Sequence, residues 1–496
     1  MPDSTTAPRS AVLRRSFRKD FPAAVRGEGV YFWDAAGKKY LDFSGSAAVN
    51  FIGHGVSEIS AAMAAQAATL EFVHTSQFTT PVAEEYAQDL LAFAGENFRG
   101  GAVYFTSGGS ESIETALKLA RQYQVEIGQP RRYQILSRKQ SYHGSTLGAL
   151  SVSGNRRRRE IYLPMLRGMV REFAHVGMPY CYRCAFDCTD GCRNCGQEYA
   201  AELDRAIAAT NGEAAAFIFE PLSGATLGAV VPPPGYLQTV AEICRRHGVL
   251  LIADEVMTGM GRTGRNFAVE HWLGKNARAK SGSAKNANEK NANEKNENGE
   301  NANLAPDILV TAKGLSSGYA PLGAVIAGKK IIDAIAAGSG AFLHGFTYNA
   351  HPVSLAAGRA VLQHLQKNNL VEAADSNQPG TPAAHLKQAL EKWYEQDPPS
   401  GAIGDVRGLG LLWAVEFVAD KKTKCPFAPE LNFAARVAAA ASQRGLLVYP
   451  MQGCVDGISG DHLLLAPPAV IAKEQITWAV DQLRASVDEA RRQDRG

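Results

Sequence analysis

Short apolar runs alternate with amphipathic stretches through the middle of the chain. Four runs are almost uniformly apolar and as long as a strand: 103–105, 215–219, 249–253 and 308–310. Such runs are typical of strands that are buried on both faces, as in a parallel sheet. Other stretches have apolar residues at helical spacing, for example Ile113, Ala116, Leu117 and Ala120. The pattern therefore predicts an α/β protein with a mostly parallel sheet.

The chain is long enough for more than one domain. It has 496 residues and 45% hydrophobic content, so it can bury a large core. We expect a large domain at 81–343 and a smaller α+β domain that combines residues 1–80 with residues 344–496. Two apolar segments, GLLVYP at 445–450 and DHLLLAPPAV at 461–470, are strand candidates for the smaller domain.

The charge balance excludes some classes of partner. The net charge is +3, so the bulk composition indicates neither a nucleic-acid nor a membrane partner. We interpret the strongest basic cluster, Arg156–Arg159, as a solvated or interface segment. No apolar stretch approaches the about eighteen residues of a membrane span, and the start of the chain lacks the apolar core of a signal peptide. We expect a cytoplasmic protein.

Lys313 follows the last of the four apolar runs and precedes a glycine-rich turn, in the segment TAKGLSSGYAPLG. An amine beside a buried strand is poorly solvated, which lowers its pKa and leaves the nitrogen free to react with an aldehyde. Taken alone, a lysine after a strand is more often a solvated surface residue. The residues upstream change this picture.

Two carboxylates, Asp254 and Glu255, end the run at 249–253. An acid at the carboxyl end of a buried strand points into the crevice where open α/β sheets bind ligands, and it needs a cationic or hydrogen-bonding partner. A protonated pyridine nitrogen is such a partner, and a lysine combined with an aspartate on the pyridine is the mark of pyridoxal phosphate enzymes. The alternative is a structural acid that caps the next turn, which fits Glu255 better than Asp254.

The phosphate of such a cofactor has a candidate site in SGGSESIETALKLAR, residues 107–121. Gly108 and Gly109 let the backbone approach an anion, and Ser110 adds a hydroxyl. The helix that follows would present unpaired N–H groups and the positive end of its dipole. Glycine-serine turns before helices are common, so the order of the three elements along the chain carries more weight than this element alone.

Seven motifs in this order make the chain resemble the class III aminotransferases, which are pyridoxal phosphate enzymes of the aspartate aminotransferase fold, fold type I. The resemblance covers nearly the whole chain. The motifs are SGGSESIETALKLAR, YHGSTLGAL from Tyr142, EPLSGATLG from Glu220, ADEVMTGMGRTGR from Ala253, TAKGLSSGYAPLGA from Thr311, FTYNAHP from Phe346 and DVRGLGLLWAVEF from Asp405.

The resemblance implies roles for the residues around the cofactor. Lys313 would hold the cofactor as a Schiff base and later move the substrate's α-proton, while Asp254 would keep the pyridine nitrogen protonated. Tyr142 would stack on one face of the ring and Val256 would pack on the other; ordinary core packing is the alternative for Tyr142. By the same resemblance, the site is completed by Gly109, Ser110, His143 and Glu220.

Three further residues are assigned by the resemblance. Thr347 belongs to a motif that reaches the phosphate in the partner subunit, which implies a homodimer with shared active sites. Arg407 resembles the arginine that binds the substrate's carboxylate, a task suited to a planar bidentate donor. Glu220 would pair with Arg407 when no carboxylate is bound; a permanent structural ion pair is the alternative. Ala47 lies where related enzymes line the substrate pocket.

Ser145 bears on the choice of acceptor. Relatives that use 2-oxoglutarate resemble HGRT where this chain has HGST. Without a second cation at this position a dicarboxylic acceptor is disfavoured, because an unpaired carboxylate is costly to bury. The pattern is closer to the ω-amine:pyruvate transaminases, so we expect an amine or ω-amino acid as donor and pyruvate as acceptor. No motif identifies the donor itself.

Five of the eight cysteines crowd into residues 180–196 and include two CxxC pairs. Such pairs can present thiolates to a tetrahedral zinc ion, and a reducing cytoplasm disfavours disulfides. The sequence leaves open a structural zinc site or a cluster of free thiols. The zinc ligands would be Cys181, Cys184, Cys192 and Cys195.

The tract at 275–303 is polar and repetitive, and we expect a disordered insertion because it cannot bury a core. It accounts for a separation between Asp254 and Lys313 that is about twice what the resemblance leads one to expect. Its deletion should leave catalysis intact, since long surface insertions cost little loop-closure entropy.

Two other functions are compatible with these residues. Relatives on this fold also catalyse decarboxylation or amino-group migration, and an enzyme fold can persist as a non-catalytic scaffold. The complete set of Lys313, Asp254, Glu220 and Arg407 favours a transaminase.

Overall fold

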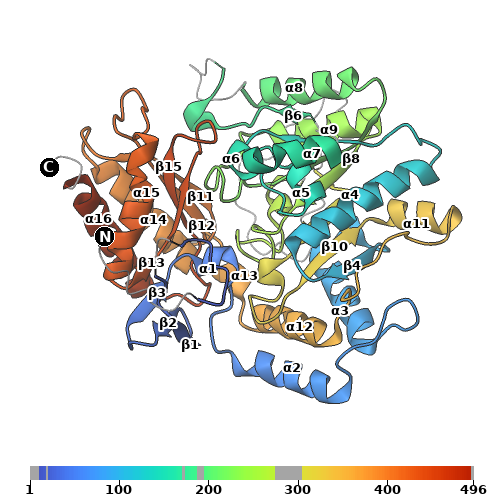
Figure 1. The fold of residues 1–496 in the computed structure, drawn as a ribbon, viewed down its shortest axis with the longest axis horizontal. Coiled ribbons are helices and arrows are strands. Elements are labelled where there is room, and N and C mark those ends of the chain that lie inside the picture. The colour runs from blue at the N-terminus through green and yellow to red at the C-terminus, as the bar shows by residue number, and fades with distance from the viewer. Residues whose placement is uncertain (1–9, 18–19, 170–173, 187–194, 274–303, 493–496) are drawn as a thin grey trace, which may run out of the picture.

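The computed structural model describes residues 10–17, 20–169, 174–186, 195–273 and 304–492. The predicted insertion at 275–303 lies outside the described residues, as do Cys188 and Cys192 of the Cys-rich segment. Within the described residues the chain forms one large sheet and two smaller ones (Figure 1).

The large sheet contains most of the apolar runs seen in the sequence. Its neighbouring strands are β4 (Ala102–Thr106), β10 (Gly323–Ala327), β9 (Ile308–Thr311), β8 (Leu250–Asp254), β7 (Ala214–Phe219), β5 (Gln134–Arg138) and β6 (His175–Val176). From β9 to β6 the neighbours run parallel, whereas β10 is antiparallel to both β4 and β9. The predicted mostly parallel α/β sheet is confirmed.

Both faces of this sheet are buried. Successive side chains of a strand point to opposite faces, so each strand contributes to two cores. In β7, Phe217 and Phe219 face one core and Ile218 faces the other. The Ile218 side is covered by α4 (Gly109–Glu126), α5 (Leu147–Val152) and α11 (Lys329–Ala337). The opposite side is covered by α8 (Cys195–Ala209) and α9 (Tyr236–His247), with α3 (Pro81–Ala94) beside β4. Next to α3 lies α12 (Pro352–Lys367), which also packs against α2 (Ser57–Thr69).

The smaller sheets combine the two ends of the chain on one side of the molecule (Figure 1). The first contains β1 (Ala24–Glu28), β2 (Tyr31–Asp34), β3 (Lys39–Asp42) and β13 (Leu446–Leu447). In it β3 pairs in parallel with β13, so Leu41 lies opposite Leu446. The second is antiparallel and contains β11 (Ile403–Leu409), β12 (Leu412–Phe417), β15 (Asp461–Leu465) and β14 (Tyr449–Gln452). The domain limits at 80 and 343 stay a prediction.

Helices flank these smaller sheets, and short helices connect the parts. The long ones are α14 (Pro382–Gln396), α15 (Phe433–Gln443) and α16 (Lys473–Arg492). The short ones are α1 (Gly45–Ala48), α6 (Arg156–Arg159), α7 (Leu163–Met169) and α13 (Leu370–Ala373).

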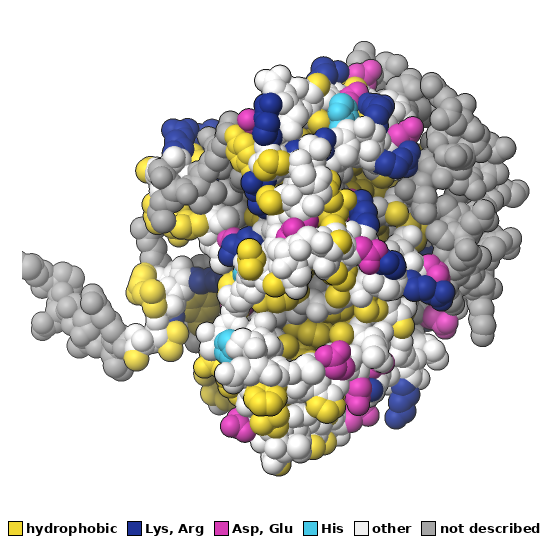
Figure 2. Space-filling view, turned by 90° about the vertical axis from the view of Figure 1, so that its right-hand side faces the viewer, with side chains coloured by type: hydrophobic (Ala, Val, Ile, Leu, Met, Phe, Trp, Pro, Cys, Tyr) yellow, Lys and Arg dark blue, Asp and Glu magenta, His cyan; other side chains and the backbone are white. Residues whose placement is uncertain are grey.

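Charges are mixed on the surface that Figure 2 shows, where acidic and basic side chains are interspersed. Of the helices in the described ranges, none combines the length and the apolar character that a bilayer crossing requires. The arginine cluster, which we interpreted as a solvated or interface segment, is solvated only in part. Arg156 and Arg157 are exposed, but Arg158 is half-buried and Arg159 is buried.

Candidate active site

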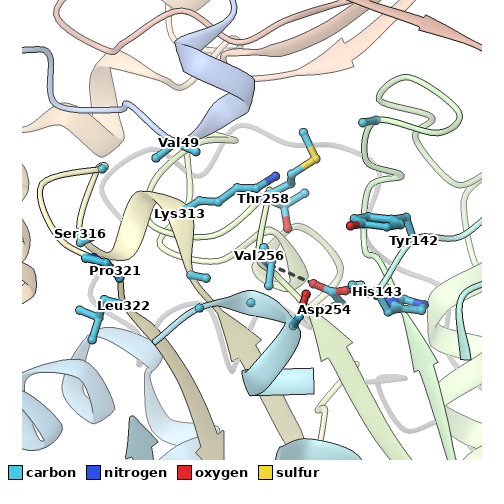
Figure 3. A pocket seen from close by; sticks show the side chains of 18 of the residues that line it. Val49, Tyr142, His143, Asp254, Val256, Thr258, Lys313, Ser316, Pro321 and Leu322 are labelled. Carbon is cyan, nitrogen blue, oxygen red and sulfur yellow. Dashed lines mark hydrogen bonds and ion pairs between the residues drawn. The ribbon is translucent and has the colours of Figure 1, made fainter. Parts of the chain in front are cut away.

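A cavity of about 330 Å³ lies where the carboxyl ends of β8 and β9 meet the N-terminus of α4 (Figure 3). Its volume is in the range of small-molecule sites, and its place is the one where open α/β sheets bind ligands. Residues singled out in the sequence line it, among them Gly108, Gly109, Ser110, Tyr142, His143, Glu220, Asp254, Val256 and Lys313.

Lys313 opens a 3₁₀ turn, Lys313–Leu315, directly after β9. Its φ of +46° lies in the left-handed region, which is unfavourable for residues other than glycine and which recurs at functional sites. Burial lowers the pKa of its amine to about 8, against the opposing influence of Asp254 and Glu220. The lowered pKa leaves more neutral amine near neutral pH, in line with the expectation from the sequence.

Asp254 ends β8 and is 5% exposed. Its Oδ1 accepts the N–H of Val256 at 3.1 Å, and its Oδ2 lies 2.7 Å from Nδ1 of His143. A carboxylate can only accept hydrogen bonds, so Nδ1 of His143 carries the proton. The backbone N–H of His143 donates to Ser153 Oγ at 2.8 Å. These bonds fix the acid at the cavity.

Glu255 has a structural role, as the sequence favoured. Its carboxylate accepts the N–H groups of Ala268 at 3.0 Å and Val269 at 2.7 Å, together with the hydroxyl of Thr258. These N–H groups belong to the first turn of the short 3₁₀ helix Ala268–Trp272. Burial raises the pKa of Glu255 to about 7.

The N-terminus of α4 is open to close approach by a ligand. A Cβ on Gly109 would lie 3.1 Å from Cγ1 of Val256, so this position has room only for glycine without a shift. Ser110 Oγ accepts the N–H of Ser145 at 3.0 Å. A helix of 18 residues directs its dipole at this point, which favours an anion. The turn therefore fits a phosphate.

Tyr142 stands at the cavity with a cation beside it. Its hydroxyl lies 2.8 Å from Ser145 Oγ, and the guanidinium of Arg158 lies 5.1 Å from the ring centroid. The charge of Arg158 also contributes to lowering the pKa of Lys313. Sequence reasoning missed Arg158 because it interpreted the arginine cluster as a solvated or interface segment and gave it no place at the cavity.

Arg407 does not line the cavity. Its Nη1 lies 2.9 Å from Asp405 and 2.8 Å from Glu416. Glu220 accepts the N–H of Gly224 at 2.9 Å, and burial raises the pKa of Glu220. In this structure Glu220 and Arg407 have different partners, and their pairing in the presence of a substrate without a carboxylate stays a prediction. The alternative of a structural ion pair fits Arg407, although with other partners.

Two other predicted positions lie outside this cavity. Val49 lines it in place of Ala47, because the chain turns through left-handed backbone at Ala47, whose φ is +66°. Thr347 lines a second cavity of about 740 Å³ together with Tyr104 and His344. The first cavity's apolar wall also includes Leu222, Ala225, Met257 and Leu322. These residues lie within three of the quoted motifs, but sequence reasoning gave them no role.

Zinc is not supported. Cys181 and Cys184 are half-buried and Cys195 is buried. No group of three or more cysteine, histidine or acidic residues that could hold a metal occurs in the part of the chain that the structure describes. The predicted ligand Cys192 lies outside that part.

The cavity fits pyridoxal phosphate on its own geometry. Asp254 can pair with a pyridine nitrogen, and the amine of Lys313, whose pKa is lowered, can react with an aldehyde. The glycine-rich start of α4 can bind a phosphate. Together with the sheet, these features define an enzyme of fold type I.

Comparison with known proteins leads to the same class. The model of the aminotransferase class-III family matches residues 15–278 and 299–487. The chain belongs to this family and is an aminotransferase. An uncharacterised aminotransferase of Bacillus subtilis, YodT, is 37% identical over 466 residues, 93% of this chain and 94% of the relative.

Two further relatives carry named activities. The diaminobutyrate–2-oxoglutarate transaminase of Halomonas elongata is 30% identical over 97% of this chain and 93% of its own. Among solved structures, an (S)-enantioselective omega-transaminase from Thermomicrobium roseum matches with a TM-score of 0.80 at 34% identity, covering 95% of this chain and 93% of that one.

Proposed function

We propose that the protein is a pyridoxal phosphate-dependent transaminase that moves an amino group from an amine or ω-amino acid to a keto acid, with pyruvate as the preferred acceptor. The observation that carries the proposal is the presence of Lys313 and Asp254 in one cavity at the start of α4. Decarboxylation or amino-group migration would use the same residues, but family membership favours transfer. The scaffold alternative has no support, because the family is enzymatic.

The residues of the cavity divide the chemistry among them. When bound, pyridoxal phosphate supplies an aldehyde that takes up amines and a ring that accepts electrons from the substrate's α-carbon. Lys313 would hold it covalently, and the Nζ of Lys313, once free, would carry the proton that leaves the α-carbon. Asp254, positioned by His143, would keep a proton on the ring nitrogen. The phosphate and ring would be held by Gly109, Ser110, Tyr142 and Val256.

Pyruvate is proposed because Ser145 supplies no cation for a second carboxylate. One observation favours 2-oxoglutarate instead: the guanidinium of Arg158 stands 5.1 Å from the Tyr142 ring centroid. The two acceptors are separated by comparing their KM values in the wild type and in the variant Arg158→Ala. If 2-oxoglutarate is the better acceptor and loses this advantage in the variant, Arg158 supplies the second cation.

We also propose a homodimer in which Thr347 serves the partner's site. Thr347 lines a cavity separate from that of Lys313. Two apolar side chains near it in the sequence are exposed, Leu343 by 79% and Tyr348 by 61%, and a partner subunit at this surface would cover them. Light scattering coupled to size exclusion tests the dimer. Thr347→Ala should weaken cofactor binding without dissociating the dimer.

An absorbance spectrum tests the function. Protein saturated with pyridoxal phosphate should show cofactor absorbance that one class of amino donor abolishes and pyruvate restores. Restoration by 2-oxoglutarate alone would overturn the acceptor proposal. Lys313→Ala is the matched control, since it keeps the phosphate site but loses the covalent attachment. Failure of the wild type to bind the cofactor would refute the proposed function as a whole.

A further inference from the structure

A short turn of left-handed backbone leads into the active-site cavity. All four residues of α1 (Gly45–Ala48) have positive φ values, from +49° to +66°. Such a run is rare, because side chains other than that of glycine crowd the backbone in this conformation. Val49, the next residue, lines the cavity together with Lys313 (Figure 3). The position of this wall residue therefore depends on a strained turn that other contacts have to hold in place.

Asp42 and the segment after β15 enclose the turn. The carboxylate of Asp42 is buried and accepts the N–H and the hydroxyl of Ser46, each at 2.9 Å, and the hydroxyl of Ser44 at 2.8 Å. On the side of β15, a Cβ on Gly45 would collide with the carbonyl oxygen of Ala466. The turn is thus packed closely on the segment that follows β15.

Arg262 connects this turn to the loop that follows β8. The residue is only 2% exposed, and its guanidinium donates to three backbone carbonyls. Nη1 binds the carbonyls of Ala466 at 3.0 Å and Pro467 at 2.7 Å, and Nη2 binds that of Asn50 at 2.9 Å. Asn50 is the second residue after the turn. The guanidinium therefore holds both the exit of the turn and the segment packed against it.

Ser317, four residues after Lys313, binds the same part of the chain. Its Oγ accepts the N–H groups of Phe51 at 2.8 Å and Ile52 at 3.1 Å. Residues 50–52 are therefore tied to the loop after β8 by Arg262 and to the turn after β9 by Ser317. These are the two places from which the sheet presents its acid and its amine to the cavity.

Arg262 also brings a positive charge into this region. Burial lowers the pKa of its guanidinium to about 9, while the charge of Asp42 opposes the shift, so the group stays protonated at neutral pH. Its loop packs directly on the turn that carries Lys313, since a Cβ on Gly314 would lie 3.1 Å from Cβ of Met260. The guanidinium is thus a buried cation on a loop in contact with the Lys313 turn.

The amine of Lys313 is sensitive to such a charge. Burial is the main cause of its lowered pKa. Arg262 and Arg158 lower this pKa further, whereas Asp254 and Glu220 raise it. A cation near the amine disfavours its protonated form and leaves more of the neutral form that reacts with an aldehyde.

We propose that Arg262 positions one wall of the cavity: it fastens the strained turn α1 to the loop after β8 and holds a buried positive charge near the amine of Lys313. The proposal rests on the proposed function, in which this cavity binds the amino donor. Without its tethers the turn can relax and Val49 can move with it, so Arg262 limits the size of the donor that the cavity accepts. Arg262 is a positioning residue, because it acts through Val49 and Lys313.

The size of the accepted donor tests the position of the wall. Holoenzyme is assayed with a panel of primary amines and the keto acid that the wild type uses, and kcat/KM is compared between the best small donor and the best bulky donor. Ser317→Ala removes one tether of residues 50–52 and keeps the charge of Arg262. Arg262→Met removes the other tether together with its charge. Each should shift the ratio about fivefold toward the bulky donor, because Val49 gains room to move.

A second measurement, independent of turnover, tests the charge. Full-length protein freed of cofactor is treated with pyridoxal and borohydride, and the adduct on Lys313 is quantified against pH. Arg262→Met should raise the midpoint of this curve by about half a pH unit, because a cation that favours the neutral amine is lost. Arg262→Lys should raise it less, and Ser317→Ala should leave it unchanged.

Arg265→Met is the matched control. Arg265 lies on the same loop but pairs with Asp375 at 2.8 Å, so its loss should change neither the donor ratio nor the midpoint. If Ser317→Ala and Arg262→Lys both keep the wild-type donor ratio, the positioning of the wall is refuted. A wild-type midpoint in Arg262→Met refutes the role of the charge.

The design separates this proposal from the function on which it rests. A wild type that takes up pyridoxal on Lys313 but transfers no amino group refutes the proposed function, whereas the midpoints still decide the role of the charge. A wild type that transfers amino groups while every variant keeps its donor ratio and midpoint refutes the present proposal alone. Arg262→Lys and Ser317→Ala change few atoms, so both readouts remain even if Arg262→Met does not fold.

Discussion

The lowered pKa of Lys313 predicts how the reactivity of the apoenzyme changes with pH. Burial brings the pKa of this amine from 10.5 to about 8. At pH 7 the neutral fraction is then about 10%, against about 0.03% for an unshifted lysine, a difference of about 300-fold. Only the neutral amine attacks an aldehyde, so the rate of covalent attachment should rise tenfold per pH unit up to about pH 8 and then level off.

In the assay, cofactor-free protein is exposed briefly to pyridoxal, and the imine that forms with Lys313 is then trapped with borohydride. Pyridoxal is used because it lacks the phosphate group, so the titration of that phosphate does not affect the result. Mass spectrometry of the peptide that contains Lys313 gives the yield at each pH. Glu220→Gln and Asp254→Asn both remove a charge that raises the pKa, so each should move the midpoint to lower pH. A yield that keeps rising to about pH 10 in the wild type would falsify the argument, because the amine would then be solvated like a surface lysine.

Three further changes test other parts of the site. Asp254→Asn should keep the cofactor bound but lower kcat on the order of a hundredfold, because the ring nitrogen loses its acid partner; cofactor content and kcat are measured on the same sample. Gly109→Ala places a Cβ 3.1 Å from Val256 and should weaken cofactor affinity about tenfold in a titration, with a smaller effect on kcat. Glu255 has a raised folded-state pKa of about 7, so its contribution to stability is full below its unfolded pKa and is lost as the pH rises to about 7 and above. Glu255→Gln should therefore remove a pH-dependent loss of up to about 3 kcal/mol, seen as a flatter curve of unfolding free energy between about pH 5 and about pH 8.

The strands of the large sheet were predictable where the chain is apolar without interruption. Residues 215–219 and 308–310 fall within β7 and β9, because a strand buried on both faces cannot tolerate polar positions. The antiparallel strand β10 was not predicted, although GAVIA at 323–327 is equally apolar. It follows the glycine-rich turn after Lys313 so closely that sequence reasoning did not single it out as a separate strand. Its pairing with β4 depends on tertiary contacts that no local pattern contains.

The residues of the site were predictable where their backbone position decides their role. Asp254 and Lys313 each follow directly from the end of a buried strand, and the ends of parallel strands meet at one edge of a sheet. Val49 lines the cavity and Ala47 does not, because the chain turns through left-handed backbone at Ala47. Such a turn changes the direction of the neighbouring side chains, and the spacing of residues in a motif does not reveal that direction. The apolar wall of the cavity comes from loops for the same reason.

Sequence motifs predict least well which charged residues from distant parts of the chain lie next to one another. The resemblance gave Arg407 a role and Glu220 as its partner in the absence of a bound carboxylate, whereas in this structure Arg407 pairs with Asp405 and Glu416. It also treated Ser145 as the loss of a cation. Arg158, thirteen residues further along the chain, lies against Tyr142, although its cluster was interpreted only as a solvated or interface segment. A motif records which residue types stand at a position, but the energy of a buried charge depends on every charge that folding brings near it. Acceptor choice in this enzyme therefore depends on the charges around the assembled cavity, and it has to be tested with variants at Arg158 as well as at Ser145 within the motif.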